Sequence, residues 1–391
     1  SFVLALPLSS ALFRSLHPRP SFNFVKSLRS ERAELLRWRR AYRRIKQKSS
    51  PPLFFLSSPP KTPSSSIPGP APGRLANRAT SFIEEHRVRG YEVGPDRGSS
   101  ITTIANLLQE VAGNHAVALW GRTDAGYATD PIMVARNLIF AATRIQIQMD
   151  EYPKWGDMVQ VETWFQEEGR VAATRNWLLR DALSGRPLGR ATSTWVMVNT
   201  KTRRLAKMPD EMRAKMDLLA PNPARDSVPS SQARLKIPDL AFLDMEGGDE
   251  GERGSSNSDS GEASSSSSDS SIIEGPKQVA RRADMDMNGH INNVTFLAWA
   301  LETVPSDVYD GMSLSEVEID YKSECLAGQT VECLAAPTTR EKGTSTSDRK
   351  APADAPGAKA FVHTLRRCDD ERCYELVRAR TTWRPAAGGK R

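Results

Sequence analysis

The sequence lacks any apolar run long enough to cross a membrane, which needs about 20 consecutive apolar residues. Cysteine is scarce as well, with four in 391 residues and none in a CxxC pair. That usage suits a reducing compartment and argues against a structural zinc site. Cys368 and Cys373 flank the polar turn DDER, so a redox disulfide across a hairpin stays open.

Acidic residues are nearly absent from the first 80 positions. Residues 1–80 hold 15 Lys and Arg against two Glu, whereas the rest of the chain holds 39 basic and 45 acidic residues. The overall charge of +7 therefore resides in the leader, and it does not predict a nucleic-acid partner. The leader is rich in Ser, Pro and Arg and is typical of an organellar transit peptide. A disordered basic tail of another purpose remains the alternative.

Globular patterning begins near Phe82 and defines a first predicted domain over 81–221. An apolar stripe from Ile101 to Val111 predicts a helix, which Ser99 or Ser100 could cap. Four segments with alternating apolar and polar residues follow and predict antiparallel strands.

A serine-rich acidic tract interrupts the patterning, and we expect a disordered linker over 222–276. Beyond it the pattern returns and predicts a second domain over 277–386. A polar insertion at about 338–359 lengthens that second domain.

The two domains match position by position, which indicates an internal repeat. Ile145 and Ile147, shifted by 172, give Val317 and Ile319, and the helix stripe recurs with a shift of 190. The sequence therefore predicts an α+β protein made of two helix-plus-sheet units.

One short motif carries the chemistry. Asp286, Asn288 and His290 occupy alternate positions just before a predicted helix, with Asn292 or Asn293 as its N-cap. In an extended segment this spacing places the three side chains on one face. Backbone amides at a helix start can also stabilise an oxyanion.

The first repeat lacks the motif and so provides an internal control. At the shift of 190 it has Asp96, Gly98 and Ser100 in place of the Asp, Asn and His. If these residues served only to start the helix, the copies would have little reason to differ. We expect the chemistry in the second repeat alone.

The segment RRADMDMNGHINNVTFLAWALETVP resembles the signature of plant and algal acyl-acyl carrier protein (acyl-ACP) thioesterases. Further matches are RGYEVGPDR, LLQEVAGNHA, EYPKWGDMVQVETW, STWVMVNTKTRRLAKMP and VEIDYKSECLAG. The resemblance implies tandem hot-dog domains, each a curved antiparallel sheet wrapped around a central helix. It also implies hydrolysis of long-chain fatty acyl-ACP in the plastid stroma, where this step ends chain elongation. No metal or other cofactor is expected, because the phosphopantetheine arm arrives with the substrate.

The resemblance places the family's catalytic set on Asp286, Asn288, His290 and Glu324, with Cys325 beside Glu324. In our preferred assignment Asn288 and a backbone amide polarise the carbonyl, and His290, oriented by Glu324, activates water. Asp286 holds the site or attacks directly. A thiolate nucleophile at Cys325, paired with His290, remains the alternative.

Two further sets of residues are assigned by analogy or by charge. We expect Met133, Ile139, Phe140 and Trp164 to line the acyl site. A short basic run could dock the acidic carrier protein or simply face solvent, and it comprises Lys201, Arg203, Arg204 and Lys207.

Other functions stay open at this stage. The chain could hydrolyse acyl-CoA, perform dehydratase chemistry, or bind acyl groups and the carrier protein without turnover. We interpret His115 as a core or interface histidine, not a second base. A homodimer is also plausible for this fold, although two repeats in one chain could already satisfy that pairing.

Overall fold

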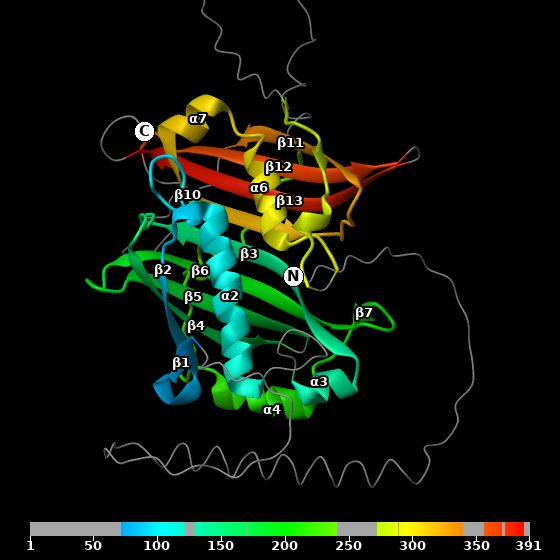
Figure 1. Ribbon diagram of the computed structural model, residues 1–391. Helices are drawn as coiled ribbons and strands as arrows, with labels where there is room; N and C mark the ends of the chain where they lie inside the picture. The colour runs from blue at the N-terminus through cyan, green and yellow to red at the C-terminus, as the bar shows by residue number, and fades with distance from the viewer. Residues whose placement is uncertain are drawn as a thin grey trace, which may run out of the picture.

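We describe a computed structural model of the chain, covering residues 72–121, 130–169, 171–240, 272–287, 289–338, 356–369 and 372–386. Most of the leader, Asn288, most of the serine-rich tract and most of the insertion lie outside these described residues. Within them, the chain forms one long antiparallel sheet with helices against it (Figure 1).

The first repeat contains most of the helices and about half of the sheet. Its elements are β1 (Gly73–Ala76), β2 (Ser81–Arg87), α2 (Ile101–Trp120), α3 (Pro131–Ala135), β3 (Leu138–Met149), β4 (Met158–Glu168), β5 (Ala172–Asp181), β6 (Pro187–Asn199), β7 (Arg204–Leu205) and α4 (Asp210–Leu219).

The second repeat follows the same order on a smaller scale. Its elements are β8 (Ile273–Glu274), β9 (Gln278–Val279), α6 (Asn293–Leu301), α7 (Ser306–Gly311), β10 (Met312–Tyr321), β11 (Thr330–Thr338), β12 (Lys359–Cys368) and β13 (Cys373–Pro385).

Helix α2 is the central helix of the first repeat. The Ser100 hydroxyl accepts a hydrogen bond from the Thr103 amide at 3.1 Å, so the predicted cap is confirmed at Ser100. Ile104, Leu108 and Val111 are buried on one face, as the stripe predicted. The helix continues to Trp120 and ends at Gly121, whose φ of 80° is in the left-handed region.

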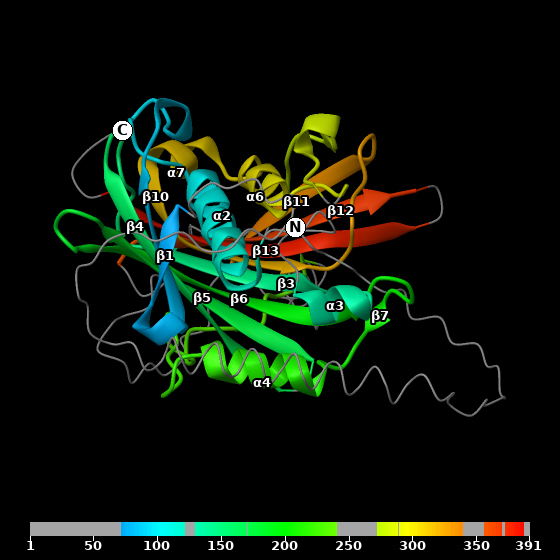
Figure 2. The ribbon, with the colours of Figure 1, turned by 60° about the horizontal axis from the view of Figure 1, so that its bottom comes forward.

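Helix α6 is the shorter equivalent of α2 in the second repeat. Asn292 caps it by accepting from the Val294 amide at 3.1 Å, which settles the choice between Asn292 and Asn293. The helix ends at Leu301, and Pro305 caps the start of α7. α6 lies on the same face of the sheet as α2 and contacts it (Figure 2).

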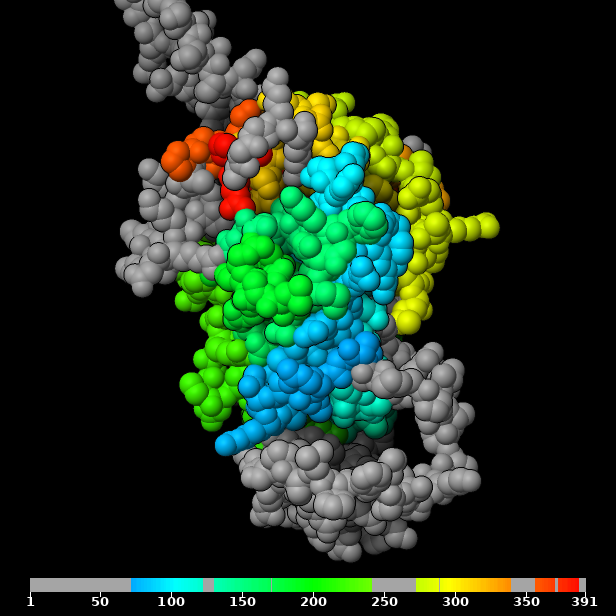
Figure 3. All heavy atoms as spheres, turned by 60° about the vertical axis from the view of Figure 1, so that its left-hand side comes forward, coloured from blue at the N-terminus to red at the C-terminus, as the bar shows by residue number. Residues whose placement is uncertain are grey.

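Strands β3 and β10 join the two repeats into one continuous sheet. Ile147 lies opposite Val317, and Gln146 lies opposite Glu318. Because a shift of 172 makes Gln146 and Glu318 equivalent, their antiparallel pairing relates the repeats by a local two-fold axis. The space-filling view shows the second repeat, in yellow to red, packed directly on the first, in blue to green (Figure 3).

The outer face of this junction is polar and buried. Gln146, Glu316 and Glu318 are each at most 2% exposed, and the Gln146 amide donates to Glu316 at 2.7 Å. Arg380 donates to Glu318 through Nε at 2.7 Å. These polar side chains bind one another beneath a covering segment, as buried polar groups usually do, although Gln146 Oε1 has no hydrogen-bond partner among the described residues.

The covering segment corrects the predicted linker. Residues 222–240 were expected to be disordered, but they lie against the sheet and bury Val228, Ile237 and Leu240. The Gln232 carbonyl accepts from the Gln146 amide at 2.9 Å. Residues 222–239 have no periodic pattern because they form no helix or strand, so their apolar residues are irregularly spaced.

The other boundaries shift by a few residues for a similar reason. β1 begins at Gly73, inside the predicted leader, because its four residues pair with β2. β8, inside the predicted linker, pairs with β11. Both strands are too short to show a pattern of their own. Cys368 and Cys373, at the facing ends of β12 and β13, form a disulfide.

Replacement of Arg380 by Met should destabilise the fold by about 3 kcal/mol, since it removes a cation from a fully buried carboxylate. The loss should lie at the lower end of the usual range because Arg144 also contacts Glu318, at 3.4 Å. Urea unfolding would measure it. Glu318→Gln in the Arg380→Met background should recover part of the loss, and no recovery would contradict the electrostatic explanation.

Candidate active site

The loop that carries Asp286 and His290, called the motif loop below, forms a tight turn. The Asp286 amide donates to the His290 carbonyl at 2.8 Å, and the His290 amide donates to Asp286 Oδ1 at 3.3 Å. Gly289 occupies a φ of 79°, which lets the chain reverse. Our expectation of an extended segment with alternating side chains was therefore wrong. The turn itself brings Asp286 and His290 together.

His290 and Glu324 face each other, as the family's catalytic set implies. His290 Nε2 lies 3.7 Å from Glu324 Oε1, slightly beyond hydrogen-bond distance. Neither His290 Nδ1 nor Glu324 Oε1 has a hydrogen-bond partner among the described residues, and both atoms are buried. Pairs of this kind often tighten only when substrate is bound.

Arg203 is the unexpected partner of this pair. Its guanidinium donates to Glu324 Oε2 at 2.9 Å from the turn between β6 and β7. All four residues of the predicted docking run, Lys201, Arg203, Arg204 and Lys207, are exposed, so Arg203 differs from the others by its contact with Glu324 and not by burial. Arg203 therefore has a contact at the site in addition to the surface position that the sequence analysis assigned to the whole basic run.

Cys325 is a buried side chain, 1% exposed, in the loop after β10. Its thiol points to the Leu326 carbonyl at 3.8 Å, and its own carbonyl accepts from the Ile291 amide at 3.3 Å. Burial raises the pKa of the Cys325 thiol to about 11, so little thiolate forms near neutral pH. These properties favour a packing role over a nucleophilic one.

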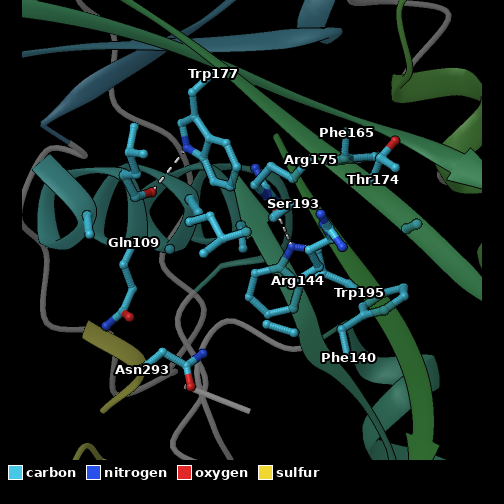
Figure 4. Close-up of a pocket in the computed structure, with 18 of the residues that line it drawn as sticks. Gln109, Phe140, Arg144, Phe165, Thr174, Arg175, Trp177, Ser193, Trp195 and Asn293 are labelled. Carbon is cyan, nitrogen blue, oxygen red and sulfur yellow. Dashed lines mark hydrogen bonds between the residues drawn. The ribbon is translucent and has the colours of Figure 1, made fainter. Parts of the chain in front are cut away.

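A cavity of about 420 Å³ extends from the motif loop into the first repeat. Asp286, Met287 and Asn293 line one end of it, beside Gln109 of α2. Figure 4 shows Asn293 and Gln109 near each other, with Phe165, Trp177 and Trp195 around the walls.

The cavity follows α2 away from the motif loop. Its lining includes Ala105 and Trp120, 15 residues apart on that helix, so it extends for roughly 20 Å at a rise of 1.5 Å per residue. Met133 of α3 and Met212 of α4 lie at the far end, beside Trp120. The walls are mainly apolar, which fits a long hydrocarbon chain.

The four residues that we expect to line the acyl site differ in where the structure places them. Met133, Ile139 and Phe140 line the cavity, whereas Trp164 does not. Trp164 donates its indole N–H to the Arg225 carbonyl at 2.9 Å, on the opposite face of β4. The next residue, Phe165, lines the cavity instead, because successive side chains of a strand point to opposite faces.

Asn293 is a site residue that the sequence reasoning missed. It is 8% exposed, and its side-chain oxygen is buried without a hydrogen-bond partner among the described residues. Since Asn292 is the cap, Asn293 is the first residue of α6 and faces the cavity. The adjacent pair of asparagines is the available signal, because only one of the two can be the cap and the other is left to face the cavity.

Arg175 is a second missed residue. It lines the cavity, and its guanidinium lies 3.1 Å from His115 Nδ1. Burial lowers the pKa of Arg175 to about 10. His115 is fully buried between Phe82 and Phe165, and burial together with Arg175 holds its pKa well below the usual value. It therefore lies in the core of the first repeat.

Two properties concern the described residues as a whole. No helix among them is long and apolar enough to cross a membrane. Within the same ranges, no group of three or more His, Cys, Asp or Glu side chains is arranged to hold a metal ion.

The tandem repeats, the paired His290 and Glu324, and the apolar cavity define a double hot-dog thioesterase. Comparisons agree: the acyl-ACP thioesterase N-terminal domain model matches residues 79–216, and the C-terminal domain model matches 271–384. The chain belongs to the acyl-ACP thioesterase family, and it is a thioester hydrolase.

Similar proteins are known in sequence and in structure. The chain is 37% identical over 320 residues to oleoyl-acyl carrier protein thioesterase 1, chloroplastic, of Arabidopsis thaliana, covering 80% of this chain and 78% of that one. It is 33% identical over 311 residues to the palmitoyl-acyl carrier protein thioesterase, chloroplastic, of the same plant, covering 80% and 66%. Both names support a plastid location.

A solved structure shares the fold. The 12:0-ACP thioesterase from Umbellularia californica superimposes with a TM-score of 0.59 at 29% identity, covering 78% of this chain and 95% of that one. The predicted α+β class of tandem hot-dog domains is confirmed.

Cys325→Ala should retain most of the turnover number, because the buried thiol contributes packing and not a nucleophile. Steady-state release of fatty acid, with a melting curve as the control for folding, would measure this. A loss on the order of 10⁴-fold in a folded variant would instead establish the Cys-His mechanism.

Proposed function

We propose that this chain hydrolyses long-chain fatty acyl-ACP to free fatty acid and ACP in the plastid stroma, without a bound cofactor. The observation that carries the proposal is the continuity of the apolar cavity with the motif loop at Asp286 and Asn293. An acyl chain lying along α2 would place its thioester carbonyl at the start of α6, next to His290. The carrier protein would remain outside.

The start of α6 suits the carbonyl group. The first amides of a helix have no partner within the helix, and they carry partial positive charge. At α6 the Asn292 side chain and carbonyl accept from the Val294 and Thr295 amides. The Asn293 side chain lines the cavity, where it faces the space that the thioester would occupy. The family resemblance adds the Asn288 amide as a further donor. Together these groups would stabilise the oxyanion of a tetrahedral intermediate.

His290 is the proposed general base. With its Nε2–H directed at Glu324, the ring carries a lone pair on Nδ1, which has no hydrogen-bond partner among the described residues. A water molecule would attack the carbonyl carbon and give its proton to Nδ1. The C–S bond then breaks, and the imidazolium returns the proton to the departing phosphopantetheine thiolate.

Asp286 has a supporting role in this assignment. Its carboxylate accepts from the His290 amide and its carbonyl accepts from the Gly289 amide at 3.1 Å, so it fixes the shape of the turn. It also lines the cavity. Direct attack by the Asp286 carboxylate on the thioester carbonyl would give an anhydride. Hydrolysis in isotopically labelled water could detect this alternative.

The surface around the cavity mouth suits an acidic carrier protein. Lys201, Arg204 and Lys207 are exposed on or beside β7, in the first repeat. Met287 at the mouth is 73% exposed, and Leu326 beyond Cys325 is 49% exposed. Cations around apolar side chains provide both steering and contact for such a partner. A homodimer stays a prediction.

His290→Ala and Glu324→Gln should each lower kcat for acyl-ACP by about 10²- to 10⁴-fold, because each removes part of the proton-transfer pair. Fatty acid release from a panel of acyl-ACPs would be measured against matched acyl-CoAs. Glu332→Gln is the control. Glu332 lies on the outer strand β11, where its carboxylate pairs with Lys277 and with Arg366 of β12. Near-normal turnover in either site variant would refute the assignment, and a preference for acyl-CoA would refute the carrier substrate.

Ala116→Phe should shift the preferred substrate to shorter acyl chains. Ala116 lines the cavity on α2, one turn before Trp120, so a phenyl ring there would fill the far end. We expect kcat/KM for the longest substrate to fall by about 10- to 100-fold, since overfilling a packed site is costly. Shorter substrates should be spared, and an equal loss for all lengths would argue against this path for the chain.

A further inference from the structure

An ion pair between the repeats connects the first repeat to the catalytic carboxylate. Arg203, just before β7, donates to Glu324 Oε2 at 2.9 Å across 121 positions of sequence. The Glu324 side chain is 17% exposed and that of Arg203 is 58% exposed. The first repeat lacks the Asp-Asn-His motif, yet its Arg203 guanidinium contacts the proposed catalytic pair directly.

The turn that carries Arg203 is held firmly. The Asn199 side-chain oxygen accepts from the amides of Lys201 and Thr202 at 3.0 and 2.9 Å, and its carbonyl accepts from the Arg203 amide at 2.8 Å. Arg203 itself has a φ of 54°, an uncommon conformation for a residue with a side chain. Strained backbone of this kind persists where the surroundings impose it, and it often occurs at functional sites.

Glu324 needs such support. It lies in the loop after β10, outside any helix or strand, so no ladder of backbone hydrogen bonds fixes it. One carboxylate oxygen is bound to Arg203, and the other is 3.7 Å from His290 Nε2 and has no hydrogen bond among the described residues. The guanidinium and the imidazole thus face different oxygens of the same carboxylate.

We propose that Arg203 is a positioning residue, which orients Glu324 toward His290 from the opposite repeat. This inference rests on the proposed function, in which the Glu324–His290 pair activates water. A partly exposed ion pair contributes little to folding stability, so the contact matters mainly for geometry. Small displacements of a catalytic group can nevertheless slow the chemical step strongly.

A positioning role and a carrier-docking role for Arg203 predict different changes in kcat and KM for substrates with and without the carrier protein. A docking residue acts only when the carrier protein is present, and its loss raises KM for acyl-ACP. A positioning residue acts on the chemical step, so its loss lowers kcat equally for acyl-ACP and for a carrier-free thioester such as acyl-N-acetylcysteamine. Comparison of the two substrates separates the roles.

The experiment measures kcat and KM for both substrates in Arg203→Gln and Arg203→Lys. We expect Arg203→Gln to lose about 10- to 100-fold in kcat on both substrates with an unchanged melting temperature. Arg203→Lys keeps the cation and should recover part of that loss. Arg186→Gln is the matched control, because Arg186 pairs with Glu151 at the other end of β6, and its kcat should equal that of the wild type.

A double mutant tests whether Arg203 acts through Glu324. Arg203→Gln should cause no further loss of kcat in the Glu324→Gln background, since residues that act as a unit are not additive. An additive loss, or an effect confined to KM for acyl-ACP, would overturn the positioning role and leave the proposed function intact. Full kcat in Glu324→Gln alone would overturn both.

Discussion

The pairing of β3 with β10 is the contact on which the rest of the structure depends. The acyl cavity belongs mainly to the first repeat, whereas the motif loop and Glu324 belong to the second. The cavity stays open at Asp286, and Arg203 stays within reach of Glu324, only if the two repeats keep a fixed position relative to each other. A continuous hydrogen-bonded ladder provides that relation, because neighbouring strands cannot slide without breaking it.

The register of this pairing is specified on both faces of the sheet. Ile147 and Val317 are fully buried beneath the helices, whereas Gln146 and Glu318 are buried on the outer face under residues 222–240. A slip by one residue would exchange the two sets and leave charges against the apolar core. The buried polar network thus helps to fix the register of the two strands.

Much of this could be predicted from the sequence, because it depends on local pattern. The repeat and a helix cap at Ser99 or Ser100 follow from the local pattern, and the His290–Glu324 pair follows from the family resemblance. The errors have other causes. Trp164 and Phe165 differ by one strand position, which alternation alone could not resolve without knowing which face was inner. The contact between Arg203 and Glu324 joins a turn of the first repeat to a loop of the second, and no local pattern encodes a contact across 121 positions.

The local two-fold axis has a consequence for how the two halves can differ. In a symmetric dimer of separate chains, a residue on the axis must face its own copy, so a Glu there would meet a Glu. Here the equivalent positions are Gln146 and Glu318, and they lie opposite each other as an unlike pair. Covalent fusion of the halves removes the requirement that every substitution occur twice. One half is thereby free to specialise in holding the hydrocarbon while the other retains the reactive groups.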